Sequence, residues 1–166
     1  MLIESEEPKD HWGFLNVKGK TVLDLGCGWY SVVVSQSTPA YFLSRGAFRV
    51  IGYDNHSPSC ERLHDLNNFE LYIESVCHAD EIRQILKKYK PNIIKCDIEG
   101  SEQAFKEISS EEMSLIEEIA IEYHNGPLKD LIKNKMIEWQ FKIIDEYPLG
   151  PELTKEPSTG VFHGRR

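Results

Sequence analysis

The chain has 166 residues, a length that favours a single domain spanning 1–166. With 40% hydrophobic and 28% charged residues, its composition is that of a globular protein and excludes a disordered or fibrous one. The net charge is −8 and the 19 Lys and Arg residues are scattered, which disfavours nucleic acid as a partner. No run approaches the roughly 20 apolar residues of a membrane span, so no membrane partner is expected.

The first residues and the cysteines bear on the cellular compartment. Residues 1–10 contain three Glu and no apolar stretch, so no signal peptide is predicted, and 1–18 is interpreted as an N-terminal extension. The four Cys residues form no CxxC pair and no zinc-binding spacing. Free thiols are typical of a reducing compartment. We therefore expect a cytoplasmic protein, and the sequence leaves open whether it forms a homo-oligomer.

The first half of the chain alternates between strand and helix patterns. Thr21–Leu25 is a short apolar run that ends in two closely spaced glycines, as a buried strand and turn do. Thr38-Pro39 predicts a helix with Thr38 as its N-cap and Pro39 in the first helical position, ending at Gly46. A second strand is expected over Phe48–Tyr53. Ser57-Pro58 repeats the cap-and-proline pattern and predicts a helix to about residue 66.

The second half continues this alternation. Apolar residues at i, i+3, i+4 and i+7 predict an amphipathic helix over 82–89, which Pro91 ends. The other expected elements are strands over 69–73, 92–96, 116–123, 139–144 and 160–163, a helix over 101–108, and a helix that starts at 126 and has inward residues up to Met136. Alternating strands and helices predict an α/β fold with a mostly parallel sheet. The last two strands have no helix between them, so they are expected to pair antiparallel.

Polar groups recur where the expected strands end. They are Asp24, Gly26 and Gly28 at the end of the first strand, Asp54 after the second, Asp97 and Glu99 after the fourth, and Glu122 and His124 at the fifth. Open α/β sheets bind ligands at the carboxyl ends of their strands. This regularity predicts a functional site at that edge of the sheet.

The first two strand ends indicate a nucleoside-containing cofactor. The glycines let the backbone approach a ligand closely, and Asp54 can accept hydrogen bonds from both ribose hydroxyls. A dinucleotide fingerprint needs a third glycine, where this chain has Ser31. The segment 29–37 also separates the turn from the helix that would bind a pyrophosphate. The pattern therefore favours S-adenosylmethionine over NAD, and an NAD-dependent oxidoreductase remains an alternative.

Three segments resemble a known family. VLDLGCG at 22–28 is similar to the first motif of class I S-adenosylmethionine-dependent methyltransferases. IIKCDIEGSE at 93–102 and IEYHNGP at 121–127 resemble the FkbM-like branch. The resemblance implies a Rossmann-like sandwich with a seven-stranded, mostly parallel sheet whose last strand is antiparallel. It also implies methyl transfer from S-adenosylmethionine to a small or modified acceptor, at oxygen.

The resemblance also implies which residues contact the cofactor. Gly26 and Gly28 would lie against its methionine part, and Asp24 would organise the loop or meet the amino group. Asp54 would hold the ribose, the stretch from Ser75 to His78 would flank the adenine, and Asp97 would lie beside the methionine end and the acceptor. The complete expected set is Asp24, Gly26, Cys27, Gly28, Asp54, Asn55, Ser75, His78 and Asp97.

His124 and Asp97 are the expected catalytic residues. A hydroxyl acceptor benefits from a nearby base, and the ordinary pKa of histidine lies near neutrality. A helix cap is the structural alternative for His124. Asp97, Glu99, Glu122 and His124 also offer the oxygen-rich ligands that Mg²⁺ or Ca²⁺ prefers, but their spacing is not diagnostic, and no metal is expected. A degenerate fold without catalysis and an RNA methyltransferase remain alternatives for the function.

Overall fold

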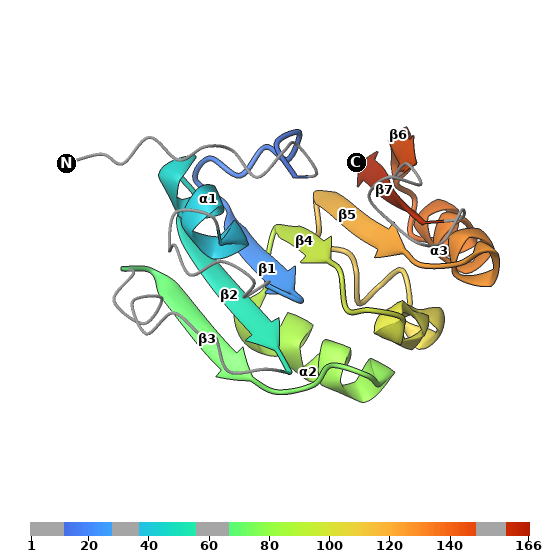
Figure 1. Ribbon diagram of the computed structural model, residues 1–166, viewed down its shortest axis with the longest axis horizontal. Helices are drawn as coiled ribbons and strands as arrows, with labels where there is room; N and C mark the ends of the chain where they lie inside the picture. The colour runs from blue at the N-terminus through green and yellow to red at the C-terminus, as the bar shows by residue number, and fades with distance from the viewer. Residues whose placement is uncertain (1–11, 28–36, 56–66, 149–158) are drawn as a thin grey trace.

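The computed structural model describes residues 12–27, 37–55, 67–148 and 159–166, which form one seven-stranded sheet between helices (Figure 1). The strands are β1 (Thr21–Leu25), β2 (Arg49–Asp54), β3 (Phe69–Ile73), β4 (Ile93–Cys96), β5 (Glu118–Tyr123), β6 (Lys142–Pro148) and β7 (Gly160–Arg165). The helices are α1 (Thr38–Ser44), α2 (Ala79–Tyr89), the 3₁₀ helix η3 (Ser101–Glu107) and α3 (Gly126–Glu138).

The strand order is β3-β2-β1-β4-β5-β7-β6. Neighbouring strands from β3 to β5 pair parallel, and β7 pairs antiparallel with both β5 and β6. The predicted α/β class, the mostly parallel sheet and the reversed last strand are thus confirmed. The order changes direction between β1 and β4, so the carboxyl ends of these two strands border the crevice where such sheets bind ligands.

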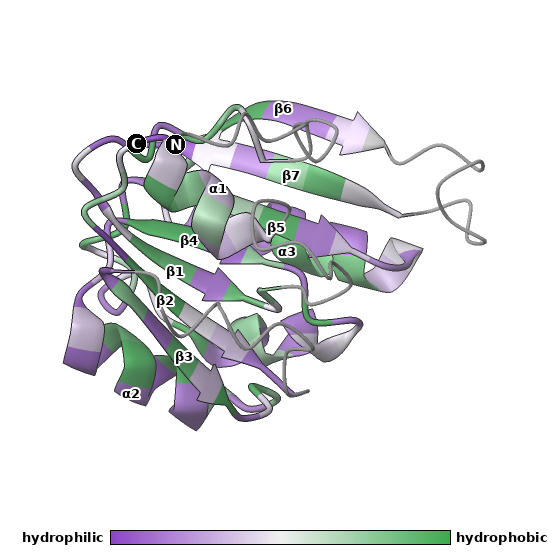
Figure 2. Cartoon of the chain, turned by 60° about the vertical axis from the view of Figure 1, so that its left-hand side comes forward, coloured by the Kyte–Doolittle hydropathy of each residue, from purple (hydrophilic) through white to green (hydrophobic). Residues whose placement is uncertain are grey.

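Alternating strand residues supply two separate cores. Leu23 and Ile94 face a cluster that includes the buried residues of α2, η3 and α3. Val22 and Ile93 face the opposite cluster, which contains residues of α1. Because side chains alternate along a strand, every second residue of each central strand reaches the same layer. Figure 1 shows α1 and α2 on opposite sides of the sheet, and in Figure 2 hydrophobic residues run along the central strands.

Residues 12–18, expected as part of an extension, belong to the packed domain. Trp12, Leu15 and Val17 are buried in the core that faces α1. Trp12 also lies over Lys95 of β4, with Nζ 5.0 Å from a ring centroid of the indole. The described part of the N-terminal segment therefore covers one face of the sheet.

Two of the expected boundaries were wrong. The N-cap of α1 is Ser37, whose hydroxyl accepts a hydrogen bond from the Ala40 amide, and Pro39 consequently occupies the second helical position. Trp139, expected in the sixth strand, is the C-cap of α3 and is fully buried. Its indole donates a hydrogen bond to the Ile108 carbonyl, so packing against η3 decides its place rather than strand alternation. The helix expected over 57–66 lies outside the described residues.

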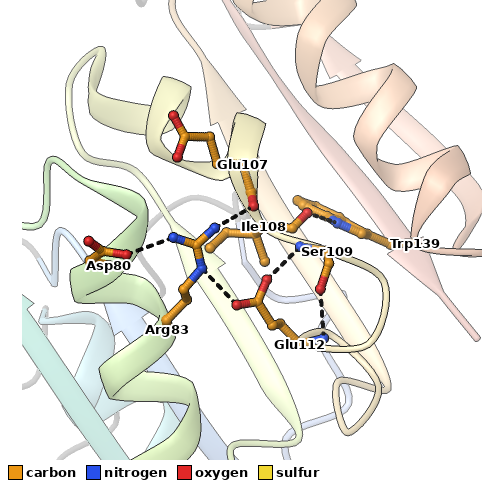
Figure 3. A network of polar contacts seen from close by, with 7 residues as sticks. All are labelled: Asp80, Arg83, Glu107, Ile108, Ser109, Glu112 and Trp139. Atoms are coloured by element: carbon orange, nitrogen blue, oxygen red, sulfur yellow. Dashed lines mark hydrogen bonds and ion pairs between the residues drawn. The ribbon is translucent and has the colours of Figure 1, made fainter.

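A polar network links the helices under the sheet (Figure 3). Arg83 of α2 forms ion pairs with Asp80 and with Glu112, both at 2.7 Å, and donates a hydrogen bond to the Glu107 carbonyl. Glu112 in turn accepts a hydrogen bond from the Ser109 amide. The network ties α2 to the segment that follows η3, and this segment leads into β5.

The buried carboxylate of Glu118 predicts a pH dependence of stability. Glu118 is 3% exposed and contacts His163 Nε2 at 2.7 Å, Arg165 Nη2 at 2.5 Å and the Asn16 amide at 3.0 Å. Burial alone would raise its pKa, but these contacts outweigh burial and lower the pKa below the ordinary 4.5. A lowered carboxylate pKa stabilises the fold above pH 4.5, and this stabilisation is lost as pH falls.

Glu118→Gln is therefore expected to reduce the free energy of unfolding at pH 7 and to flatten its decline between neutral and acidic pH. Urea unfolding measured from pH 7 down to pH 3 tests this. Glu117→Gln is the control, because Glu117 is adjacent in sequence and half exposed, so its charge is largely screened. Equal flattening in both variants would contradict the assignment.

Candidate functional site

Gly26 forms the turn at the carboxyl end of β1. Its φ is +70°, a conformation that glycine adopts without steric cost. Its amide donates a hydrogen bond to the Tyr53 carbonyl at 2.8 Å, which fixes the turn beside the end of β2. A Cβ at this position would lie 1.6 Å from the Asp97 carbonyl oxygen. The turn therefore passes so close to the end of β4 that only glycine fits.

Asp24 is fully buried and organises the connection from β1 to α1. The Thr38 hydroxyl lies 2.6 Å from Asp24 Oδ2 and 2.8 Å from the Cys27 carbonyl oxygen. Lys95 Nζ lies 3.1 Å from Asp24 Oδ1. These contacts match the loop-organising role expected for Asp24. They also explain why Thr38, expected as the N-cap, has its hydroxyl directed at the β1 turn instead.

Lys95 is a residue of the site that the sequence analysis did not single out. It is 1% exposed and lies in register with Asp24 on the neighbouring strand. Its Nζ also contacts the carbonyl oxygens of Leu25 and Gly26. Burial lowers the pKa of Lys95, but the charges of Asp24 and Asp97 outweigh that effect and raise it, so the ammonium stays charged. The signal in the sequence was a lysine within an otherwise apolar strand.

The remaining expected cofactor residues fall at neighbouring positions. Asp54 ends β2 and is partly buried, and Asn55 follows it, exposed. Cys27 is 3% exposed, and burial raises the pKa of its thiol, as expected for a packing residue rather than a reactive one. Gly28 lies outside the described residues. The ends of β1 and β2 thus bring Gly26 and Asp54 to the same edge of the sheet.

Ser75 and His78 follow β3 and are exposed. Ser75 lines a hollow of about 240 Å³ together with Tyr53, Tyr72 and residues of α2. His78 is the N-cap residue of α2, and its amide donates a hydrogen bond to Glu81 Oε2 at 2.9 Å. A structural role accounts for the position of His78, and adenine contact by either residue stays a prediction.

Beyond β4 and β5, four carboxyl groups surround one imidazole. His124 Nε2 lies 3.7 Å from Asp97 Oδ1, 3.6 Å from Glu99 Oε2 and 3.6 Å from Glu122 Oε1. On the other side of the ring, Nδ1 lies 3.2 Å from Oε1 of the fully buried Glu102. We call these five residues the acidic cluster. The structure thus brings together all four residues that the sequence analysis weighed as metal ligands, and adds Glu102.

Two members of the acidic cluster, His124 and Glu122, have raised pKa values. The contact with Glu102 and the charges of Glu122 and Asp97 raise the pKa of His124 to about 9, against the opposing effect of burial. Burial and the nearby Asp97 raise the pKa of Glu122 to about 8. At neutral pH His124 is therefore mostly protonated, which makes it a poor proton acceptor unless its surroundings change.

Glu102 was not predicted as a site residue, although it lies in the DIEGSE motif. Its Oε1 accepts a hydrogen bond from the Ile98 amide at 3.1 Å, four residues back. Two residues between Ile98 and Glu102 have positive φ values, +51° at Glu99 and +94° at Gly100. This sharp bend returns the chain so that Glu102 lies beneath His124.

Comparison with known proteins bears on the fold. No family model and no curated protein matches the chain. Among solved structures, the ribosomal protein L11 methylase of Lactobacillus delbrueckii subsp. bulgaricus matches with a TM-score of 0.55 and 14% identity over 91% of this chain and 72% of that one. A fibrillarin/Nop5p complex matches with a TM-score of 0.58 and 16% identity over 89% and 73% of the two chains.

A third structure contains a cofactor product. The 1,6-didemethyltoxoflavin-N1-methyltransferase of Burkholderia thailandensis, with bound S-adenosylhomocysteine, matches with a TM-score of 0.52 and 15% identity over 90% of this chain and 72% of that one. The chain has the fold of a class I methyltransferase. In this fold the turn at Gly26 lies at the carboxyl end of β1, and the acidic cluster lies at the carboxyl ends of β4 and β5, along the same edge of the sheet. Among the described residues, no helix is long and apolar enough to cross a membrane.

Proposed function

We propose that the chain binds S-adenosylmethionine and transfers its methyl group to a hydroxyl oxygen of a small or modified acceptor. The observation that carries the proposal is that two sets of residues lie on either side of the point between β1 and β4 where the strand order changes direction. The close-packed turn at Gly26 and the carboxylate of Asp54 lie on one side, and Asp97 with His124 lies on the other. The methyltransferase fold of the solved structures supports this assignment, including the one with bound S-adenosylhomocysteine.

The cofactor side of the proposal uses the ends of β1 and β2. Asp54 accepts hydrogen bonds from the ribose hydroxyls, and the backbone from Gly26 to Gly28 lies against the methionine part. Asp24 acts indirectly, because its carboxylate is already held by Lys95 and Thr38. Asn55, Ser75 and His78 complete the set around the nucleoside.

The acceptor side uses Asp97 and His124. Methyl transfer is an in-line displacement at a sulfonium, so the main task of these residues is to hold the acceptor oxygen in line with the methyl group. The acceptor must also lose a proton, and His124 is the proposed base, a role that requires its imidazole to be neutral when the acceptor is bound. We also propose that the chain is related to the FkbM-like methyltransferases, which the DIEGSE motif followed by His124 supports.

Calorimetric titration with S-adenosylhomocysteine, with NAD as the control ligand, tests the proposal. Binding of S-adenosylhomocysteine alone is the expected result. Binding of NAD alone would replace the proposal with an oxidoreductase. Binding of neither ligand would contradict the cofactor assignment and favour a degenerate fold without catalysis.

Asp54→Ala is expected to weaken binding of S-adenosylhomocysteine by roughly 10- to 150-fold, because the ribose hydroxyls lose a charged hydrogen-bond partner. The same titration measures the change. Asp145→Ala is the control, since Asp145 is exposed on β6, at the opposite end of the strand order from β2 and β3. Unchanged affinity in Asp54→Ala would remove Asp54 from the site.

A further inference from the structure

We propose that Asp97, Glu122 and His124 bind one divalent metal ion. These residues come from the ends of two neighbouring strands, β4 and β5, and each is partly buried. One potential ligand atom from each residue lies within 4.8 Å of the other two. The sequence analysis expected no metal because residue spacing was not diagnostic, whereas the folded arrangement brings the three side chains to one point.

The distances around His124 Nε2 are those of ligands that share an ion. Asp97 Oδ1 at 3.7 Å and Glu122 Oε1 at 3.6 Å are too far from the ring nitrogen for hydrogen bonds. Two ligands that each lie about 2.1 Å from a tetrahedral metal are about 3.4 Å apart. Only small side-chain movements would therefore complete the coordination.

Glu102 provides an independent argument. Its side chain is fully buried, with an exposed fraction of 0%, and its Oε2 has no hydrogen-bond partner among the described residues. Its other oxygen lies 3.2 Å from His124 Nδ1, on the side of the ring away from Asp97 and Glu122. A carboxylate behind a metal-binding histidine is a usual arrangement, because it fixes the tautomer in which the opposite nitrogen is free to coordinate.

The charge of the acidic cluster also calls for a cation. Within the described ranges, the ion pairs of its four carboxylates all go to His124. Asp97 and Glu122 are partly buried and Glu102 is fully buried, and one imidazole cannot balance these three carboxyl groups when all of them are ionised. A divalent ion would offset this excess and would be held by two carboxylate oxygens and one imidazole nitrogen. That mixed donor set suits first-row ions such as Mn²⁺ or Zn²⁺ better than Ca²⁺.

The role of the ion rests on the proposed function. Three protein ligands leave coordination positions open, so an acceptor hydroxyl bound to the ion would have a lowered pKa and would release its proton to solvent water. His124 Nε2 is then a ligand, and the ion supplies the acceptor activation that otherwise falls to His124. Metal binding itself does not depend on this role and can be measured without cofactor or acceptor.

Titration of the metal-free full chain with Mn²⁺, followed by calorimetry and by electron paramagnetic resonance, tests the proposal. One ion per chain is expected, with a nitrogen coupling in the pulsed spectrum that reports His124. Asp97→Asn and Glu122→Gln are each expected to weaken binding by about 100-fold or more, at or above the upper end of the roughly 10- to 100-fold that loss of a supporting group costs. Glu99→Gln is the matched control, because it removes the same charge from an exposed side chain equally close to Nε2 but outside the set of three.

The control is expected to weaken binding by less than about fivefold, the effect of one exposed charge. Equal losses in Glu99→Gln and Glu122→Gln, several weakly bound ions, or a wild-type spectrum without nitrogen coupling would each overturn the proposal. The spectrum needs no variant, so a misfolded substitution cannot obscure the result. S-adenosylhomocysteine binding measured separately shows whether the proposed function fails independently.

Discussion

Gly26→Ala is expected to lower the free energy of unfolding by about 2–5 kcal/mol, the sum of a left-handed backbone and an overpacked contact. The new Cβ would lie 1.6 Å from the Asp97 carbonyl oxygen, so either the turn or the end of β4 must move. Because both border the crevice, binding of S-adenosylhomocysteine should be lost as well. Urea unfolding and calorimetric titration measure the two effects.

Gly19→Ala separates the two causes. Gly19 has a φ of +72°, nearly that of Gly26, but a Cβ there would meet no atom within 4 Å. It therefore has the same backbone strain without the collision, and should lose only about 1–2 kcal/mol. If the free energy of unfolding falls equally in the two variants, the close approach of Gly26 to Asp97 does not contribute to the loss of stability.

Lys95→Met is expected to lower the free energy of unfolding by about 3–5 kcal/mol, because it leaves the buried carboxylate of Asp24 without its cation. Asp24 is fully buried, and Lys95 Nζ at 3.1 Å is its only ion-pair partner among the described residues. The methionine fills nearly the same volume, so the loss reports charge rather than packing. Urea unfolding at pH 7 measures it.

The double variant Asp24→Asn with Lys95→Met should recover most of this loss, since neither charge remains and the amide can still bond to the Thr38 hydroxyl. Lys20→Met is the exposed control. Lys20 pairs with the half-exposed Glu117, and exposed pairs contribute only about 0.2–1 kcal/mol. A double variant as unstable as Lys95→Met alone would show that the lysine acts through something other than Asp24.

The sequence was sufficient to predict the order of the described elements because the hydrophobic periods are strong. The pattern of α2 at residues 82, 85, 86 and 89 matches its buried face. Boundaries failed where two neighbouring residues could serve the same purpose. Ser37 and Thr38 are both able to cap α1, and the choice depends on Asp24, which attracts the Thr38 hydroxyl. That contact spans two elements and has no local pattern.

The candidate site was also predicted in part, with the strand-end residues included and Lys95 and Glu102 missed. Strand ends are readable from sequence, so Asp24, Asp54, Asp97, Glu122 and His124 were predicted to share one edge of the sheet, and the structure places them at the carboxyl ends of β1, β2, β4 and β5. Lys95 was missed because its burial depends on register with Asp24 across two strands separated by about 70 residues. Glu102 was missed because a bend with two positive φ values returns it to His124. Pairing between strands and the shape of a bend follow from three-dimensional packing.

The indole of Trp12 over Lys95 has a practical consequence for work with this protein. Deleting residues up to 18 would remove Trp12, Leu15 and Val17 from the core that faces α1 and would open a path for water to the Lys95–Asp24 pair. A shortened chain would therefore be impaired around the ends of β1 and β4, although none of the deleted residues belongs to either strand. Affinity tags are better attached ahead of the intact first residues than in place of them.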